Sequence, residues 1–315
     1  MDCRAKFGKI HNMTIIDRET FLELPTVEAA KLVRKAGTKV CVFPINGTRR
    51  WFILEHWRDI QDDPVKAYLD ITTRSHIEIY KLCFTHGLDT LITPVFGSEL
   101  LNRGDEYVKM AVDGMTRLAT HPDFLSFYQE YKVSVRFYGD YRKHLAGTPY
   151  AYLSSMFDQI SQRTVHNDRH RLFYGVFAND ATETVAELSV RHFQRTGTIP
   201  SRKELIEFYY GDYIEKANIF IGFEKFNVFD YPLLGWGEES LYFTAAPSLY
   251  LSERQLRNIL YDHIYLRPVQ DPDYNEMPAQ DFESMRTYYQ KNREATFGVG
   301  EMHAGIWYAK TQIQE

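Results

Sequence analysis

A glycine, a threonine and two adjacent arginines follow a short apolar run in the segment "KVCVFPINGTRRWF", residues 39–52. Gly47 lets the backbone approach a ligand closely, and the residues after it can open a helix or turn whose free N–H groups favour an anion. Arg49 and Arg50 add permanent charge and forked donors that suit phosphate oxygens. Gly47, Thr48, Arg49 and Arg50 therefore predict a diphosphate site; the alternative is a solvated pair of surface arginines. The segment contains neither the P-loop pattern nor GxGxxG.

Apolar runs typical of strands alternate with amphipathic segments typical of helices along most of the chain. This alternation predicts an α/β fold with a mainly parallel sheet, in which ligands bind at the carboxyl ends of the strands. A helical pattern over residues 65–86 ends at Gly87, and the stretch 147–167 is expected to form an excursion or lid. Four segments follow predicted strands and are expected to share one rim: "INGTRRW", "FGSELLNR", "YGDYRK" and "FANDATE".

The composition excludes several classes of function. The 315 residues carry a net charge of -5, so the chain has no general attraction to nucleic acid or to an anionic membrane. No run reaches the roughly 20 apolar residues that span a bilayer, and the first residues lack the apolar core of a signal peptide. Cys3, Cys41 and Cys83 are too few for a disulfide framework or a Cys-rich zinc site. We therefore expect a cytoplasmic protein.

Four collinear segments resemble the cis-prenyltransferase family. "VFPINGTRRW" is similar to the strand and D-G-N-G-R-W signature of that family, and "LDTLITPVFGSELLNR", "VRFYGD" and "SLYFT" resemble three later blocks. The resemblance implies a mostly parallel six-stranded sheet flanked by helices. It further implies a single domain over residues 1–315, with a core at about 39–267 and an extension at each end, and a homodimer.

The departures from the chain-elongating members of that family concern the second substrate and the metal. "FIGFEKFNVFDYPLL" stands where those enzymes carry the arginine motif for the second diphosphate, and only Lys225 is basic in it. Asn46 replaces the motif aspartate, and Ser240 replaces the acidic residue before L-Y-F. The resemblance implies Mg²⁺ as a cofactor, while these replacements leave its ligands unidentified. We expect the first diphosphate site to be kept and the second to be lost.

Further segments resemble a narrower group, the bacterial diterpene synthases built on this fold, among them the tuberculosinol and kolavelool synthases. These segments include "NRGD", "FYGDY", "FDYPLL", "LYFTAAPS", "LYDHIYLR" and "FGVG". By this resemblance, a separate class II diterpene cyclase supplies a bicyclic C20 diphosphate of kolavenyl or tuberculosinyl type. The enzyme ionises it, releases diphosphate and quenches the cation with water, which gives an alcohol. The alternatives are transfer to a nucleoside such as adenosine and a partner subunit without catalytic activity.

The resemblance also suggests roles for side chains outside the arginine segment. Arg103 follows a second predicted strand and would add a diphosphate contact, unless it is a solvated residue at a helix start. Tyr68 would stabilise the cation with its ring or orient water with its hydroxyl, unless it is a core residue. Asp180 would order the attacking water or accept its proton, although capping of the next helix explains it equally well. Asn46 supplies no base, so we predict that it lowers turnover while preserving substrate binding.

Overall fold

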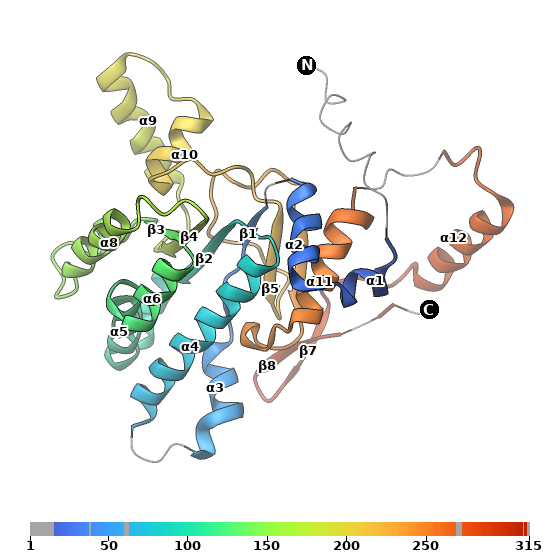
Figure 1. Ribbon diagram of the computed structural model, residues 1–315, viewed down its shortest axis with the longest axis horizontal. Helices are drawn as coiled ribbons and strands as arrows, with labels where there is room; N and C mark the ends of the chain where they lie inside the picture. Colours follow the sequence, from blue (N-terminus) through green and yellow to red (C-terminus); the bar gives the residue numbers. More distant parts are fainter. Residues whose placement is uncertain (1–15, 38, 60–62, 269–272, 311, 314–315) are drawn as a thin grey trace.

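The protein is described by a computed structural model that covers residues 16–37, 39–59, 63–268, 273–310 and 312–313. Its centre is a six-stranded sheet in the order β3-β4-β2-β1-β5-β6, in which every neighbouring pair is parallel (Figure 1). The strands are β1 (Val40–Val42), β2 (Thr90–Phe96), β3 (Val133–Tyr138), β4 (His170–Val176), β5 (Ile219–Phe223) and β6 (Ser240–Thr244). The predicted parallel α/β sheet is confirmed.

Helices cover both faces of the sheet because neighbouring strand residues point to opposite sides. Cys41 belongs to one hydrophobic cluster and Val42 to the other. The first cluster holds buried residues of α1 (Arg18–Glu23), α2 (Thr26–Lys35), α4 (Pro64–Thr85), α5 (Asp105–Thr120), α6 (Pro122–Glu130), α7 (Tyr141–Leu145), α8 (Tyr152–Arg163) and α11 (Glu253–Tyr261). The second holds α10 (Arg202–Tyr210), with α9 (Thr182–Thr196) packed against it.

Local signals placed the ends of several helices correctly. Asp63 caps α4 by accepting a hydrogen bond from the backbone N–H of Lys66 (3.0 Å), and Gly87 follows the helix with a φ of +92°. Ser252 caps α11 in a reciprocal pair with Gln255. The predicted helix over residues 65–86 is therefore confirmed.

The sequence expectation for residues 147–167 was wrong. The stretch 147–167 is not a lid, because α8 buries Leu153, Phe157 and Ile160 at helical spacing. The ring of Phe157 stacks on Phe137 of β3 at 3.9 Å between centroids. Phe21 of α1 is fully buried in the first cluster, so the N-terminal helices also contribute to the hydrophobic core.

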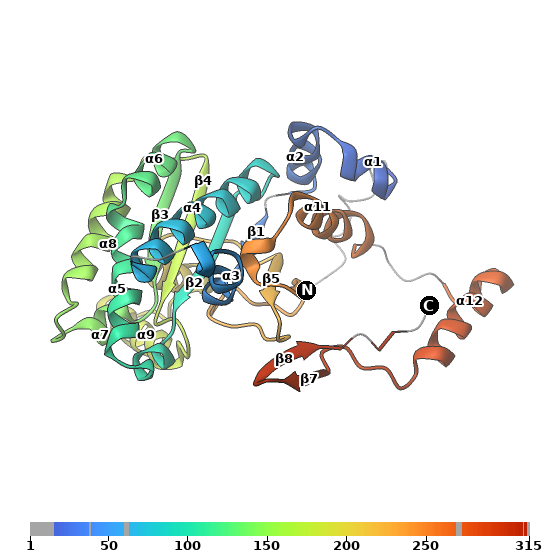
Figure 2. The same cartoon turned by 90° about the horizontal axis from the view of Figure 1, so that it is seen from below.

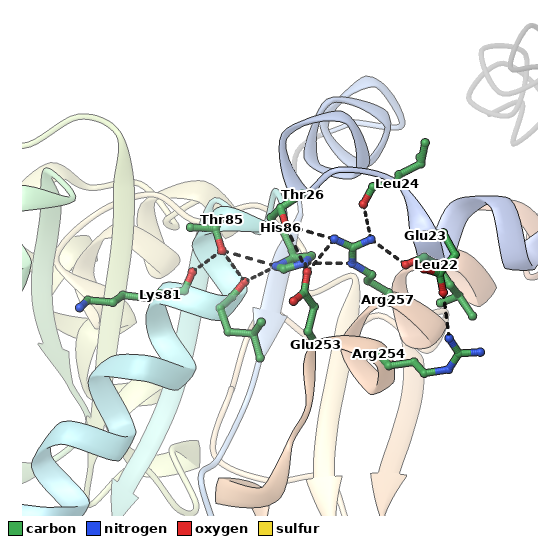
Figure 3. Close-up of polar contacts among 11 residues, drawn as sticks. Leu22, Glu23, Leu24, Thr26, Lys81, Thr85, His86, Glu253, Arg254 and Arg257 are labelled. Atoms are coloured by element: carbon green, nitrogen blue, oxygen red, sulfur yellow. Dashed lines mark hydrogen bonds and ion pairs between the residues drawn. The ribbon is translucent and has the colours of Figure 1, made fainter.

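A buried arginine ties the N-terminal helices to α11 (Figure 3). Arg257 is only 5% exposed. Its guanidinium donates hydrogen bonds to the backbone oxygens of Leu22 and Leu24, and to Thr26, Glu253 and His86. The Nδ1–H of His86 donates to the carbonyl of Leu82 (2.8 Å), and its Nε2 lies 3.3 Å from Arg257 Nε and 3.1 Å from Glu253 Oε1. The protein itself thus satisfies this charge.

The C-terminal extension lies apart from the sheet (Figure 2). It consists of α12 (Ala279–Asn292), which has no buried residue in the part of the chain described, and the antiparallel hairpin of β7 (Gly300–His303) and β8 (Ile306–Ala309). None of the described helices has the length and apolar character needed to cross a bilayer. Cys41 and Cys83 are buried free thiols, whereas Cys3 and the segment predicted to lack a signal peptide lie outside the described residues.

Candidate active site

The arginine segment begins α3 (Thr48–His56) at the carboxyl edge of the sheet. Gly47 precedes the helix with a φ of +74°, and a Cβ there would lie 2.7 Å from the Phe223 ring. Its position therefore requires glycine for both conformation and space. Asn46 is fixed beside it, since its backbone N–H donates to the Ser248 hydroxyl (3.1 Å) and its carbonyl accepts from the Ser248 N–H (3.0 Å). The predicted helix opening is confirmed.

The arginines line a polar cavity of about 570 Å³ outside the ends of β1, β2 and β5. Arg49 is exposed and has no ion-pair partner among the residues described. Arg50 approaches Glu224 (Nη2 to Oε2, 3.3 Å), and its Cζ lies 5.3 Å from the centroid of the Phe223 ring. Arg103, at the end of the short η4 helix (Ser98–Arg103), lines the same cavity. Three permanent cations therefore converge on one space.

An apolar cavity of about 190 Å³ extends from the polar one between α4, α5 and β2. Two of its polar side chains bond to the helix backbone: the Thr72 hydroxyl donates to the Tyr68 carbonyl (2.6 Å) and His76 Nδ1 to the Thr72 carbonyl (2.6 Å). Burial lowers the pKa of His76, so its ring is neutral. Much of the remaining lining is apolar, with Leu69, Met110, Ala111, Met115, Leu118 and Phe124. It also includes the side chains of Asn46, Thr48 and Thr73 and the buried hydroxyls of Tyr80 and Thr93. This cavity suits a hydrocarbon.

Tyr68 stands where the apolar and polar cavities meet, and it lines both. Its hydroxyl is 2.9 Å from the hydroxyl of Thr48, and its ring meets Phe52 edge-on at 5.2 Å. Burial raises the pKa of Tyr68, so the hydroxyl is protonated at neutral pH. Tyr68 can therefore offer either a ring face to a cation or a proton to an oxygen.

The comparison with known proteins gives the family. No family model matches the sequence. The chain is 47% identical over 300 residues to a tuberculosinyl adenosine transferase of Mycobacterium tuberculosis (strain CDC 1551 / Oshkosh), which covers 95% of this chain and 100% of that protein. The chain belongs to the tuberculosinyl adenosine transferase family. A (+)-kolavelool synthase of Herpetosiphon aurantiacus is 25% identical over 283 residues, or 89% of this chain and 92% of that protein.

Solved structures confirm the fold of this family member. A probable undecaprenyl diphosphate synthase from Campylobacter jejuni superposes with a TM-score of 0.55 at 12% identity, over 76% of this chain and 98% of that one. Lavandulyl diphosphate synthase from Lavandula x intermedia, solved with dimethylallyl diphosphate, gives 0.57 at 13% identity, over 77% of this chain and 100% of that one. The cis-prenyltransferase fold expected from the sequence is thus confirmed.

The expected common rim is only partly formed in this tuberculosinyl adenosine transferase relative. The residues that line the two cavities include none from "YGDYRK" or "FANDATE" in the described chain, because β3 and β4 lie beyond β2 in the sheet. Asp180 lines a neighbouring depression instead. Its carboxylate accepts a hydrogen bond from the Thr182 N–H (3.4 Å) at the start of α9. A catalytic role for Asp180 stays a prediction, and its position favours the local role.

The residues present fit a magnesium ion poorly. Within the described ranges, no group of three or more His, Cys, Asp or Glu side chains is arranged to hold a metal. Asn46 offers a neutral oxygen only. Ser240 begins β6, at the opposite edge of the sheet from Asn46, and its hydroxyl is 2.9 Å from His263 Nδ1. The magnesium dependence implied by the fold family stays a prediction.

One wall of the polar cavity was missed from the sequence. It is the loop after β5, with Glu224, Lys225, Asn227, Phe229 and Asp230. The segment was interpreted only as a lost diphosphate motif. Its position beside the arginines follows from the pairing of β5 with β1, and strand order cannot be read from local periodicity. The sequence signal for a site at this edge came from Gly47, Thr48, Arg49 and Arg50, on another segment of the chain.

Proposed function

We propose that this enzyme transfers a bicyclic C20 prenyl group from its diphosphate to adenosine. The observation that carries the proposal is the junction at Tyr68, where an apolar cavity opens into a space lined by three arginines. A hydrocarbon can thus lie in the apolar cavity and a diphosphate among the arginines, with Tyr68 between them. The 47% identity to a protein named for transfer to adenosine favours this acceptor over the water expected from the sequence.

Ionisation of the donor requires stabilisation of the charge that grows on the leaving group. Arg49, Arg50 and Arg103 face the space for the diphosphate, and the N-terminus of α3 adds the positive end of its dipole. Such groups accelerate the reaction when they bind the departing diphosphate more tightly than the intact ester. The electron pair of the carbon–oxygen bond leaves with the diphosphate, and the aromatic ring of Tyr68 stabilises the cation.

Capture of the cation distinguishes adenosine from water. Water must lose a proton after attack, and the neutral amide of Asn46 cannot accept one at the position beside the arginines. Burial raises the pKa of Tyr68, so its hydroxyl is protonated and poorly suited to act as that base. A ring nitrogen of adenosine attacks with its lone pair and needs no base. The neutral Asn46 therefore favours a nitrogen nucleophile.

A second candidate is the water quench that gives a diterpene alcohol. It is favoured by the similarity to a protein named (+)-kolavelool synthase. To separate the two, purified protein is incubated with tuberculosinyl and kolavenyl diphosphates, with and without adenosine, magnesium and a chelator, and the products are identified by mass spectrometry. An adenosine adduct is expected. Alcohol alone would replace the proposal with the second candidate, and no product from any diphosphate would indicate a non-catalytic subunit.

The source of the substrate and the oligomeric state complete the proposal. We infer that a class II diterpene cyclase supplies the bicyclic diphosphate and that the enzyme acts in the cytoplasm as a homodimer. Apolar side chains exposed on the C-terminal extension, such as Tyr289 and Phe297, are compatible with a contact between copies. Light scattering is expected to give twice the chain mass of 37.0 kDa; a mass of one chain at micromolar concentration would contradict the dimer.

A further inference from the structure

The loop that follows β5 is a fixed wall of the polar cavity. Its first residue, Glu224, donates its backbone N–H to the Thr244 carbonyl (3.0 Å). The Tyr138 hydroxyl donates to the Asp230 carbonyl (2.7 Å), and the Tyr210 hydroxyl to the Pro232 carbonyl (2.7 Å). Side chains from β3 and α10 therefore hold the loop in place, so its residues present a preformed surface to a ligand.

The charge of this wall is wrong for a second diphosphate. Glu224 and Asp230 carry carboxylates, and Lys225 is the one cation that the loop adds to the cavity lining. Glu224 also neutralises part of the positive charge of Arg50, because its Oε2 lies 3.3 Å from Arg50 Nη2. An acceptor bearing a diphosphate would be repelled by the carboxylates. The wall instead fits an acceptor that is uncharged when it binds.

The residues of this loop offer a purine nucleoside hydrogen-bonding partners and an aromatic surface. Carboxylate oxygens accept hydrogen bonds from ribose hydroxyls, and the Asn227 amide can both donate to and accept from the edge of a base. The half-buried ring of Phe229 supplies an aromatic surface in the same lining. Asp230 and Phe229 also line the neighbouring depression of about 540 Å³, so a ligand in the cavity has room to extend past them.

We propose that residues 224–230 form the acceptor site and bind an uncharged purine nucleoside. This inference rests on the proposed function, whose acceptor it locates. The carbon–oxygen bond of the donor breaks and its electron pair leaves with the diphosphate. The lone pair of a ring nitrogen then forms the carbon–nitrogen bond, and no proton leaves. The base gains one positive charge, which Glu224 and Asp230 stabilise by attraction.

Direct binding of adenosine tests the site independently of turnover. Equilibrium dialysis measures the dissociation constants of adenosine, with pyrophosphate present, and of pyrophosphate alone. The proteins compared are the wild type, Asp230→Asn and Glu238→Gln. Asp230 has a φ of +61°, which asparagine tolerates well. Glu238 is an exposed carboxylate of the same loop, outside the cavity lining, and is the matched control.

We expect Asp230→Asn to weaken adenosine binding by about tenfold, because it removes the charge from one acceptor. Glu238→Gln should bind adenosine and pyrophosphate like the wild type, and Asp230→Asn should bind pyrophosphate at least as tightly as the wild type, because it removes a negative charge from the cavity lining. Asn227→Ala, at an exposed position, provides a second variant with a several-fold loss should Asp230→Asn fold poorly by circular dichroism.

The binding measurements test the acceptor site, and the product analysis tests the transfer reaction separately. Unchanged adenosine affinity in both loop variants overturns the acceptor site, even if the wild type forms the adduct. A wild type that does not bind adenosine at all overturns it too. Adenosine binding that the loop variants weaken, together with alcohol as the sole product, supports the site and overturns the proposed transfer.

Discussion

Arg257 and the pair Arg49 and Arg50 place the same side chain in opposite settings. Arg257 is buried, and its donors reach backbone oxygens, a hydroxyl, a carboxylate and an imidazole of the protein (Figure 3). The Arg50 side chain is 38% exposed with one carboxylate partner, and Arg49 is exposed beside a cavity. An arginine whose acceptors come from the protein holds the fold together, whereas one that faces a cavity is available to a ligand.

The largest expected effect is on catalysis by the cavity arginines. The double variant Arg49→Ala, Arg50→Ala should lower turnover by about 100-fold or more, since the leaving group loses its charge stabilisation. Its free energy of unfolding should change by less than about 1 kcal/mol, because exposed ion pairs contribute little. Steady-state kinetics and urea denaturation measure the two quantities. Arg74→Ala, at an exposed position of α4, is the control; near-normal turnover in the double variant would remove the diphosphate site from this loop.

Arg257→Ala should show the reverse pattern. The carbonyls of Leu22 and Leu24 lose their donor and Glu253 loses its partner, which should lower the free energy of unfolding by about 3 kcal/mol. Turnover per folded molecule should stay normal, because Arg257 does not line the cavities. Denaturant titration and active-site titration provide the measurements. A stable variant with poor turnover would mean that the contrast between the two arginine settings is mistaken.

Asn46→Asp sharpens the comparison by adding a base beside the cavity arginines. We expect the rate of alcohol formation to rise by at least about tenfold, since a carboxylate can accept the proton that an attacking water loses. The share of alcohol among the products should rise as well, because water gains a proton acceptor. Product analysis by mass spectrometry and initial rates test this. A rate of alcohol formation that is unchanged or lower would show that the amide does not limit this reaction.

Tyr68→Phe should have the smallest effect. It keeps the ring at the junction and removes the contact between its hydroxyl and Thr48 (2.9 Å). A loss of roughly fivefold in turnover corresponds to one hydrogen bond. Tyr68→Leu, which removes the aromatic face as well, should lose more if the ring stabilises the cation. Equal rates for the two variants would argue against that role of the ring.

Local signals account for what was predicted from the sequence. The strands, the long helix α4 and the helix opening after Gly47 follow from periodicity and capping chemistry. Resemblance added the number of strands in the sheet. The excursion expected at 147–167 is a core helix because apolar spacing outweighs the Gly and Pro residues before it.

The features that could not be predicted from the sequence depend on contacts between segments far apart in the chain. Arg257 lies more than 200 positions from Leu22 and Thr26, so nothing around it in the chain marks it as structural. The loop at Glu224 faces Arg50 only because β5 pairs with β1. Asp180 follows a strand, as ligand-binding residues often do, yet its strand lies two places from β1 in the sheet.

The ion pair between Arg50 and Glu224 links the proposed donor and acceptor sides of the cavity. A diphosphate bound at Arg50 competes with Glu224 for the guanidinium and frees that carboxylate for the acceptor. In a transferase this favours a sequential order, with the prenyl diphosphate bound first and the nucleoside second. The cation is then formed with its nucleophile already bound. The order of substrate binding follows from Arg50, which contacts Glu224 and would contact the diphosphate.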